Sequence, residues 1–309
     1  MVNLVAAQRP LLHGLMKLAG IRPTTVDIEP EGTTMSFWVP SETLVKPNKK
    51  PNKPKPVVVL IHGFAAEGIV TWQFQVGALT KKYSVYVPDL LFFGGSATGA
   101  SDRSPTFQAE CLAAALFKLG VTRCTLVGFS YGGMVAFKLA EMWPDLVEAL
   151  VVSGSILAMT ESISEAELNR MGFRSSSELL LPTSVNGLKT LLKIATHKNL
   201  WFPHRLHKDY LEVMFTNRKE RSELLEALVI AKQNPDIPIF TQRIHLLWGE
   251  NDQIFRMEMA QQMKEKLGEK ATYEGIKKAG HLVHLERPCV YNRCLKSFLA
   301  SVYTDHDKK

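Results

Sequence analysis

The sequence predicts an α/β fold built on a mostly parallel sheet, with a block of helices inserted before the last strands. Continuous apolar runs such as Val57–Ile61 recur along the chain, and such runs are typical of strands buried on both faces of a parallel sheet. Amphipathic helical patterns alternate with these runs, as they do in α/β proteins. About ninety residues between Ser153 and Ile244 interrupt this alternation and contain no strong strand pattern.

The expected elements follow one another in a regular order. A hairpin comes first, from extended segments Thr24–Ile28 and Thr34–Val39 on either side of Gly32. The runs that predict buried strands are Val57–Ile61, Ser84–Val87, Cys124–Val127, Ala149–Val152 and Ile244–Trp248, with Thr272–Ile276 as a weaker candidate. The patterns that predict helices between them are Ile69–Lys81, Thr106–Leu119, Tyr131–Met142, Met257–Leu267 and Val290–Val302.

The interrupting stretch is expected to form helices, because so long a loop without structure would be unusual in a compact domain. Its amphipathic segments are Ser164–Met171, Ser175–Leu180, Asn186–Ala195, His207–Phe215 and Lys219–Gln233. The sequence therefore predicts a core made of residues 1–154 and 240–309. A helical cap, residues 155–239, is expected over the carboxyl edge of its sheet.

The composition excludes several classes of protein. Of the 309 residues, 46% are hydrophobic and 22% charged, which is too apolar for a chain that is disordered as a whole. No apolar run reaches eighteen residues, so we expect no transmembrane helix. The four cysteines, Cys111, Cys124, Cys289 and Cys294, have neither CxxC nor zinc-type spacing. They are expected to be free, buried thiols in a reducing compartment.

The net charge of +7 is partly local. Lysines 46, 49, 50, 53 and 55 lie in the Pro-rich stretch Val45–Pro56, which has no interleaved aromatic residues. It is expected to be a solvated loop, and the alternative is contact with an anionic surface. We therefore expect no nucleic-acid partner. The segment Met1–Ile21 lacks a secretory pattern and fits a short amphipathic helix on the protein body or on a membrane surface. Thr304–Lys309 carries no retention or peroxisomal signal. A cytoplasmic location is the resulting expectation, with monomer and homodimer both open.

The strongest chemical signal is the pentapeptide Gly128–Gly132, which reads Gly-Phe-Ser-Tyr-Gly. It follows an apolar strand and opens a helical pattern, which is the context that a G-x-S-x-G nucleophile requires. The glycines on either side let the backbone make a strained turn, so that the Ser130 hydroxyl projects alone above the sheet. Ser130 is therefore the predicted nucleophile, and the alternative is a plain serine cap of the helix.

A serine hydroxyl needs a general base, and the base needs an acid to hold its tautomer. His281 follows the last predicted strand and is the preferred base, with His284 as its competitor. Asp252 lies on the turn after strand Ile244–Trp248 and is the preferred acid, with Glu250 as its rival. The oxyanion is expected to bind the backbone N–H of Tyr131 and that of Phe64.

These motifs together resemble the α/β-hydrolase superfamily. The resemblance rests on His62-Gly63-Phe64, Gly128–Gly132, Asp252 and Gly280-His281, and on a glycine-rich loop at residues 89–96, and it covers about residues 24–302. It implies an eight-stranded, mostly parallel sheet flanked by helices, with an inserted helical cap. Residues 1–30 are similar in character to those of plant members. His62 is expected to brace its loop rather than to act as a base.

One departure within that superfamily narrows the chemistry. Epoxide hydrolases and haloalkane dehalogenases carry an aspartate where Ser130 stands, so their alkyl–enzyme route is not expected here. The resemblance instead implies a serine hydrolase that cleaves a small-to-medium apolar or aromatic carboxylic ester through an acyl-enzyme, without metal or cofactor. A phenolic or benzyl-type ester such as benzyl salicylate is one example. Three alternatives stay open: hydrolysis of a carbon–carbon bond in a vinylogous diketone, acyl transfer to an alcohol, and a hydrolase-like hormone receptor.

The substrate is expected to bind between the cap and the core, because ligand sites form in such clefts. Phe129 adds aromatic surface beside the serine, and the inserted stretch supplies further aromatic and apolar side chains. Phe129, Trp201, Tyr210 and Met214 are the predicted substrate-binding residues. They favour an apolar ligand over a charged one.

Overall fold

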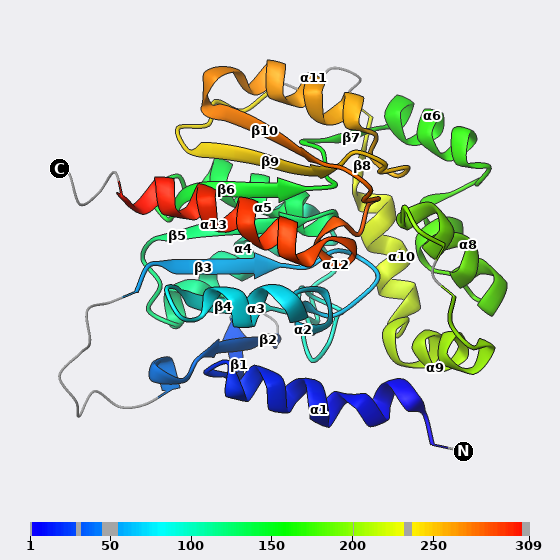
Figure 1. Ribbon diagram of the computed structural model, residues 1–309, viewed down its shortest axis with the longest axis horizontal. Helices are drawn as coiled ribbons and strands as arrows, with labels where there is room; N and C mark the ends of the chain where they lie inside the picture. Colours follow the sequence, from blue (N-terminus) through cyan, green and yellow to red (C-terminus); the bar gives the residue numbers. More distant parts are fainter. Residues whose placement is uncertain (1, 29–31, 45–54, 200, 232–236, 305–309) are drawn as a thin grey trace.

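The structure is a computed structural model that describes residues 2–28, 32–44, 55–199, 201–231 and 237–304 (Figure 1). Within these residues the main sheet has eight strands in the order β1-β2-β4-β3-β5-β6-β9-β10. Their bounds are β1 Ile21–Ile28, β2 Thr33–Pro40, β3 Val57–Ile61, β4 Ser84–Pro88, β5 Cys124–Phe129, β6 Val147–Ser153, β9 Arg243–Gly249 and β10 Ala271–Ile276. Strand β2 pairs antiparallel with β1 and with β4, and the other neighbours are parallel. The predicted fold class is confirmed.

The central strands are buried on both faces, which explains their unbroken apolar runs. Val127 of β5 lies in register between Leu60 of β3 and Val151 of β6, and all three side chains are inaccessible to solvent. Helices cover both faces, so the sheet separates two apolar cores (Figure 1). Helices α3 (Gln73–Leu79) and α13 (Pro288–Thr304) pack on one face, and α4 (Pro105–Lys118), α5 (Tyr131–Met142) and α11 (Met257–Leu267) on the other. Short helical turns occur at η1 (Ser41–Leu44), η2 (Gly268–Lys270) and α12 (Val283–Glu286).

The prediction of one continuous helix at Ile69–Lys81 is wrong, because the helix is interrupted. The chain forms two helices, α2 (Gly68–Thr71) and α3, which meet at Trp72. Trp72 leaves helical geometry with φ −102° and ψ 18°, and its side chain is fully buried. Its ring packs beside His284 and Tyr291, so tertiary packing overrides the local helical pattern.

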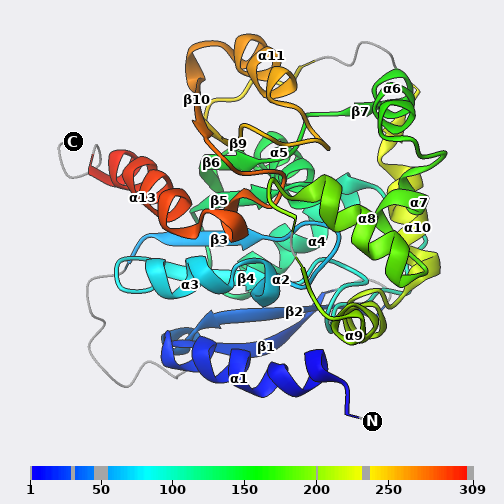
Figure 2. The same cartoon turned by 45° about the vertical axis from the view of Figure 1, so that its right-hand side comes forward.

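Helices α6 to α10, called the inserted helices below, lie beyond the carboxyl ends of the parallel strands (Figures 1 and 2). Their bounds are α6 Glu161–Met171, α7 Ser176–Leu180, α8 Val185–Ala195, α9 His204–Met214 and α10 Arg218–Ala227. The helix predicted at Lys219–Gln233 ends early, and Gln233 lies outside the described residues. Instead, β8 (Val229–Ile230) pairs parallel with β7 (Met159–Thr160), which joins the two ends of the insertion.

The first helix, α1 (Leu4–Leu18), lies on the protein body, which was one of its two predicted locations. It packs against α9 and α3, while Leu11, Leu15 and Leu18 remain exposed. None of the described helices is long and apolar enough to cross a membrane. Most of the predicted lysine-rich loop, residues 45–54, lies outside the described residues.

The cysteines are free, as predicted, but not all of them are buried. Cys111, Cys124 and Cys294 are buried, whereas Cys289 is exposed. Cys289 is the second residue of α13 and lies on the side of that helix that faces solvent. The prediction of burial from the apolar character of a thiol is therefore wrong for Cys289.

Candidate active site

Ser130 occupies a strained turn between β5 and α5. Its backbone has φ +53° and ψ −121°, a conformation that residues with a side chain rarely adopt. The turn is tight enough to exclude side chains around it. A Cβ atom on Gly128 would lie 2.7 Å from the carbonyl oxygen of Gly132, and one on Gly132 would lie 2.3 Å from that of His62. The two glycines of the motif are therefore required by packing.

Three predicted residues come together at this turn. The Ser130 hydroxyl lies 3.1 Å from His281 Nε2, and His281 Nδ1 lies 2.8 Å from Asp252 Oδ2. Asp252 Oδ1 accepts hydrogen bonds from the backbone N–H groups of Ile254 and Phe255, at 2.8 and 2.9 Å. Because both carboxylate oxygens are engaged, the carboxylate is fixed in direction. Asp252 and His281 are 3% and 5% exposed, so water does not compete for these bonds.

The competing acid and base are placed elsewhere. Among the described residues, the carboxylate that hydrogen-bonds His281 is that of Asp252 and not that of Glu250. His284 is fully buried, and its ring packs against Phe129 and Trp72, with centroid separations of 4.4 and 5.0 Å. Neither ring nitrogen of His284 has a hydrogen-bond partner in the described structure. The imidazole that bonds Ser130 is therefore that of His281, and His284 packs against Phe129 without a bond to the serine.

His284 gives the protein a defined sensitivity to acid. Burial lowers the pKa of His284 from 6.5 to about 3. The folded protein keeps the His284 ring neutral, whereas the ring in the unfolded chain takes up a proton below pH 6.5. The folded state is therefore not penalised by His284 above pH 6.5. It loses stability relative to the unfolded chain as the pH falls from 6.5 toward 3. We expect His284→Phe to lessen the loss of unfolding free energy between pH 7 and pH 5 by about 2 kcal/mol.

Urea unfolding of parent and variant at the two pH values measures this difference. His204→Phe, which replaces an exposed histidine of α9, is the matched control and should leave the acid sensitivity of the parent unchanged. Equal acid sensitivity in the parent and in His284→Phe would contradict the prediction.

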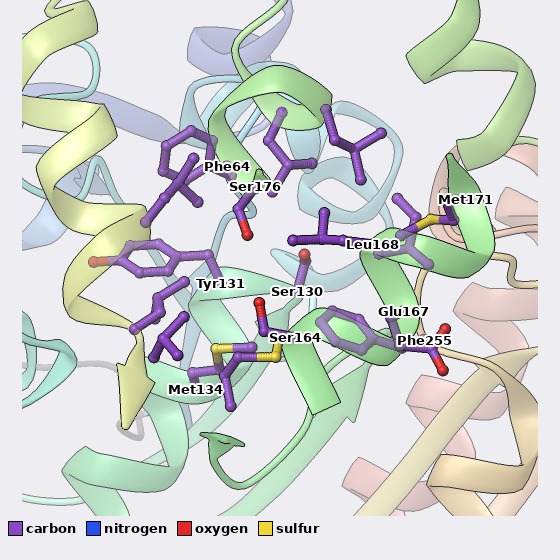
Figure 3. A pocket seen from close by; sticks show the side chains of 17 residues that line it. Phe64, Ser130, Tyr131, Met134, Ser164, Glu167, Leu168, Met171, Ser176 and Phe255 are labelled. Carbon is purple, nitrogen blue, oxygen red and sulfur yellow. The ribbon is translucent and has the colours of Figure 1, made fainter. Parts of the chain in front are cut away.

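The predicted oxyanion donors lie beside the serine. Phe64 and Tyr131 line the same cavity as Ser130 (Figure 3). No hydrogen bond among the described residues uses the backbone N–H of either one. Tyr131 is the first residue of α5, where the helix dipole favours negative charge. The Phe64 ring packs edge-on against Phe93 and Tyr131, which holds its loop in place.

His62 joins the loop after β3, which contains Phe64, to the loop after β4, so its predicted bracing role is confirmed. Its Nδ1–H donates to the carbonyl of Gly63 at 2.6 Å, and its Nε2 accepts from the N–H of Leu90 at 2.9 Å. Burial lowers the pKa of His62 to about 4, so the ring stays neutral and can accept that bond. The loops after β3 and β4 are thereby joined.

Comparison with known proteins places this geometry in a family. The sequence model for the alpha/beta hydrolase fold matches residues 56–288, three quarters of the chain. The chain belongs to the alpha/beta hydrolase fold family. That span includes Ser130, Asp252 and His281.

The curated relatives of this alpha/beta hydrolase, and the solved structures of other proteins that resemble it, carry several names. Epoxide hydrolase 3 of Xenopus tropicalis is 25% identical over 82% of this chain and 74% of its own length. Monoacylglycerol lipase ABHD6 of Homo sapiens is 26% identical over 82% of this chain and 79% of its own length. The carboxylesterase CesB of Bacillus subtilis superposes with a TM-score of 0.68 at 18% identity, covering 96% of this chain and 98% of the other. The structural likeness shows the fold alone.

Two small cavities meet at Ser130 in this alpha/beta hydrolase. The first, about 60 Å³, lies on the Tyr131 side and is walled by Met134, Leu168 and Phe255 (Figure 3). The second, about 90 Å³, lies on the His281 side. Phe64, Ser130, Leu180 and Ile254 line both cavities. Ser130 therefore lies between two largely apolar cavities.

Of the four predicted substrate-binding residues, two line the cavities at Ser130. Phe129 and Tyr210 line the cavity on the His281 side, and the Tyr210 hydroxyl donates to the carbonyl of Ala65. Met214 is buried further out, in a groove described below. Trp201 is 83% exposed and lines none of the cavities described here. It precedes Pro203 in the connection before α9, where the side chain faces solvent.

Sequence reasoning missed one residue of the site, Gly154. It follows β6 with φ +54°, and a Cβ atom there would lie 2.7 Å from Cε1 of His281 and 3.3 Å from Asp252 Oδ2. Gly154 therefore forms the floor under the imidazole. The only local signal is the run of small residues Ser153-Gly154-Ser155, which does not reveal a neighbour more than a hundred residues away.

Proposed function

We propose that this protein is a serine hydrolase that cleaves an apolar carboxylic ester through an acyl-enzyme. The observation that supports this most is the unbroken hydrogen-bond chain from Asp252 through His281 to the Ser130 hydroxyl. A hydroxyl paired with an imidazole, itself oriented by a buried carboxylate, is the arrangement that activates serine.

In the proposed reaction, Ser130 Oγ attacks the ester carbonyl while His281 Nε2 takes its proton. Asp252 stabilises the imidazolium, and the N–H groups of Phe64 and Tyr131 stabilise the oxyanion. His281 then protonates the leaving alcohol, which departs from the acyl-enzyme. Water activated by His281 frees the acid and restores the serine.

The serine argues against the epoxide chemistry for which some relatives are named. The epoxide hydrolases use an aspartate at this position, and their enzyme-bound intermediate is an ester that water can cleave. Attack by Ser130 on an epoxide would instead leave an ether, which has no carbonyl for water to attack. Ester cleavage is the reaction that matches the residues present.

The walls of the site favour an apolar substrate. Methionine, leucine and phenylalanine side chains form most of the lining on the Tyr131 side, and the polar residues besides Ser130 and Tyr131 are Ser164, Ser176 and Glu167. Glu167 is paired with Arg170 and Arg256, so its charge is already satisfied. We propose that the inserted helices act as a cap over this site. An aromatic or aliphatic ester fits it, benzyl-type esters included.

Fluorophosphonate labelling combined with a substrate panel tests the proposal. We expect one label per chain on Ser130, located by mass spectrometry of peptides, and turnover of p-nitrophenyl butyrate. Labelling at another residue would contradict the nucleophile. Turnover of a vinylogous diketone, with no turnover of any aryl or alkyl ester, would replace ester cleavage by carbon–carbon bond hydrolysis.

The contact between Gly154 and His281 leads to a further prediction. We expect Gly154→Ala to lower kcat for p-nitrophenyl butyrate by about 100-fold, because the added methyl group displaces the imidazole from Ser130. Gly77→Ala in α3 is the matched control, since a Cβ atom at Gly77 meets nothing within 4 Å. Unchanged kcat in a folded Gly154→Ala variant would show that His281 does not act from the position seen here.

A further inference from the structure

A groove under the first helix is larger than either cavity at Ser130. It has a volume of about 500 Å³ and is lined by residues of α1, α2, α3, α8, α9 and α12. We call it the α1 groove. Leu12 lies on the wall formed by α1, and Leu206 on the wall formed by α9. Its volume is in the range of about 300–1,000 Å³ that is usual for small-molecule sites, whereas the two cavities at Ser130 are far smaller.

The α1 groove adjoins the catalytic cavity on the His281 side, because six residues line both. The residues that line both are Val70, Leu188, Leu192, Tyr210, Leu282 and Leu285. Five of these six side chains are aliphatic, and the sixth, Tyr210, uses its hydroxyl to bond Ala65. The wall that the two spaces share is therefore largely apolar. It suits hydrocarbon better than a charged or hydroxylated group.

The position of His281 decides which half of an ester points this way. The leaving alcohol has to receive a proton from His281 Nε2, so its oxygen must lie on the His281 side of the carbonyl. His281 lines the cavity that adjoins the α1 groove and does not line the cavity on the Tyr131 side. The acyl half is then left with the smaller compartment of about 60 Å³.

We propose that the α1 groove binds a long alkyl chain on the alcohol half of the ester, while the acyl half is short. This assignment rests on the proposed ester hydrolysis. The one permanently charged lining residue, Arg9, is ion-paired with Glu67, so the groove carries no free charge for an ionic head group. Leu11, Leu15 and Phe202 line its outer end and are 68%, 51% and 37% exposed. A chain that fills the groove can therefore extend to the surface.

Two isomeric esters test this direction of binding. Octyl butyrate places the long chain on the alcohol, and butyl octanoate places it on the acid, so the two have the same atoms and nearly the same hydrophobicity. We expect kcat/KM of the parent protein to be at least about tenfold higher for octyl butyrate, a ratio typical of a few methylene contacts made or lost. We expect Leu12→Trp, which fills the groove far from Ser130, to remove this preference.

Leu18→Trp is the matched control. Leu18 is on the same helix, is 86% exposed and does not line the groove, so this variant should keep the preference. Leu206→Trp narrows the groove from the opposite wall and serves if Leu12→Trp does not fold. A preference for butyl octanoate, or a preference for octyl butyrate that survives both groove substitutions, would overturn the assignment.

Two separate measurements distinguish failure of the proposed ester hydrolysis from failure of the proposed alkyl-chain binding in the α1 groove. A protein that cleaves neither isomer and takes no fluorophosphonate at Ser130 lacks the ester hydrolysis on which the assignment rests. Calorimetry with 1-octanol on Ser130→Ala measures groove binding without turnover. If 1-octanol binding to Ser130→Ala is lost when Leu12→Trp is added but kept when Leu18→Trp is added, the result supports alkyl-chain binding in the α1 groove. If neither added substitution changes the binding, the result opposes it.

Discussion

Replacing Ser130 by alanine is expected to abolish ester hydrolysis, lowering kcat by at least about 10⁴-fold. The hydroxyl is the only group of the site that lies within hydrogen-bond distance of His281 Nε2 among the described residues. Without it, the imidazole has no nucleophile to activate, and what remains is binding and the oxyanion donors. Steady-state hydrolysis of p-nitrophenyl butyrate measures the loss.

The fold should survive this substitution. The Ser130 side chain makes no capping bond to α5, so its removal leaves no backbone donor unpaired. The thermal unfolding midpoint of Ser130→Ala should therefore stay within a few degrees of the parent, about the effect of a 1 kcal/mol change. Hydrolysis at the parent rate in this variant would remove Ser130 from the mechanism.

The second large effect is expected for Asp252→Asn, with a loss in kcat of about 10⁴-fold. The backbone N–H groups of Ile254 and Phe255 would still bond the amide oxygen, because that side of the residue accepts two hydrogen bonds. The amide NH₂ would then face His281 Nδ1 and force the proton onto Nε2. An imidazole with its proton on Nε2 cannot accept the proton of the Ser130 hydroxyl.

Glu250→Gln is the matched control for that substitution. It makes the same chemical change two residues away, at a carboxylate that does not bond His281. We expect its kcat to stay within about threefold of the parent, because Glu250 is half-buried and makes no bond to the three residues Ser130, His281 and Asp252. If Glu250→Gln lost activity while Asp252→Asn retained it, the assignment of the acid would be wrong.

The elements of the fold and the site that local sequence defines could be predicted. Ser130 was recognisable because a strand, a tight turn and a helix are encoded by adjacent residues. Asp252 and His281 could be expected because each follows a predicted strand, and parallel strands bring their carboxyl ends to one edge of the sheet. His284 is set apart from His281 by its burial against Phe129. That contact joins residues distant in the sequence, so the residues beside His284 do not reveal it.

What could not be predicted depends on contacts distant in sequence or on very short elements. Gly154 matters because of a histidine far along the chain. The pairing of Met159–Thr160 with Val229–Ile230 involves too few residues to produce a pattern. Trp201 was assigned to the site on its chemistry alone, and the direction of a side chain in a connecting segment is not encoded by residue type.

The start of the chain is fastened to α9. The N–H of Leu4 donates to Asp209 at 2.7 Å, and Arg205 donates to the carbonyl of Val2 at 2.6 Å. Any polypeptide fused ahead of residue 2 would therefore begin beside α9, which forms one wall of the α1 groove. Purification handles placed there would alter the molecule under assay, so kinetic comparisons of this protein call for handles placed after residue 309 or for their removal.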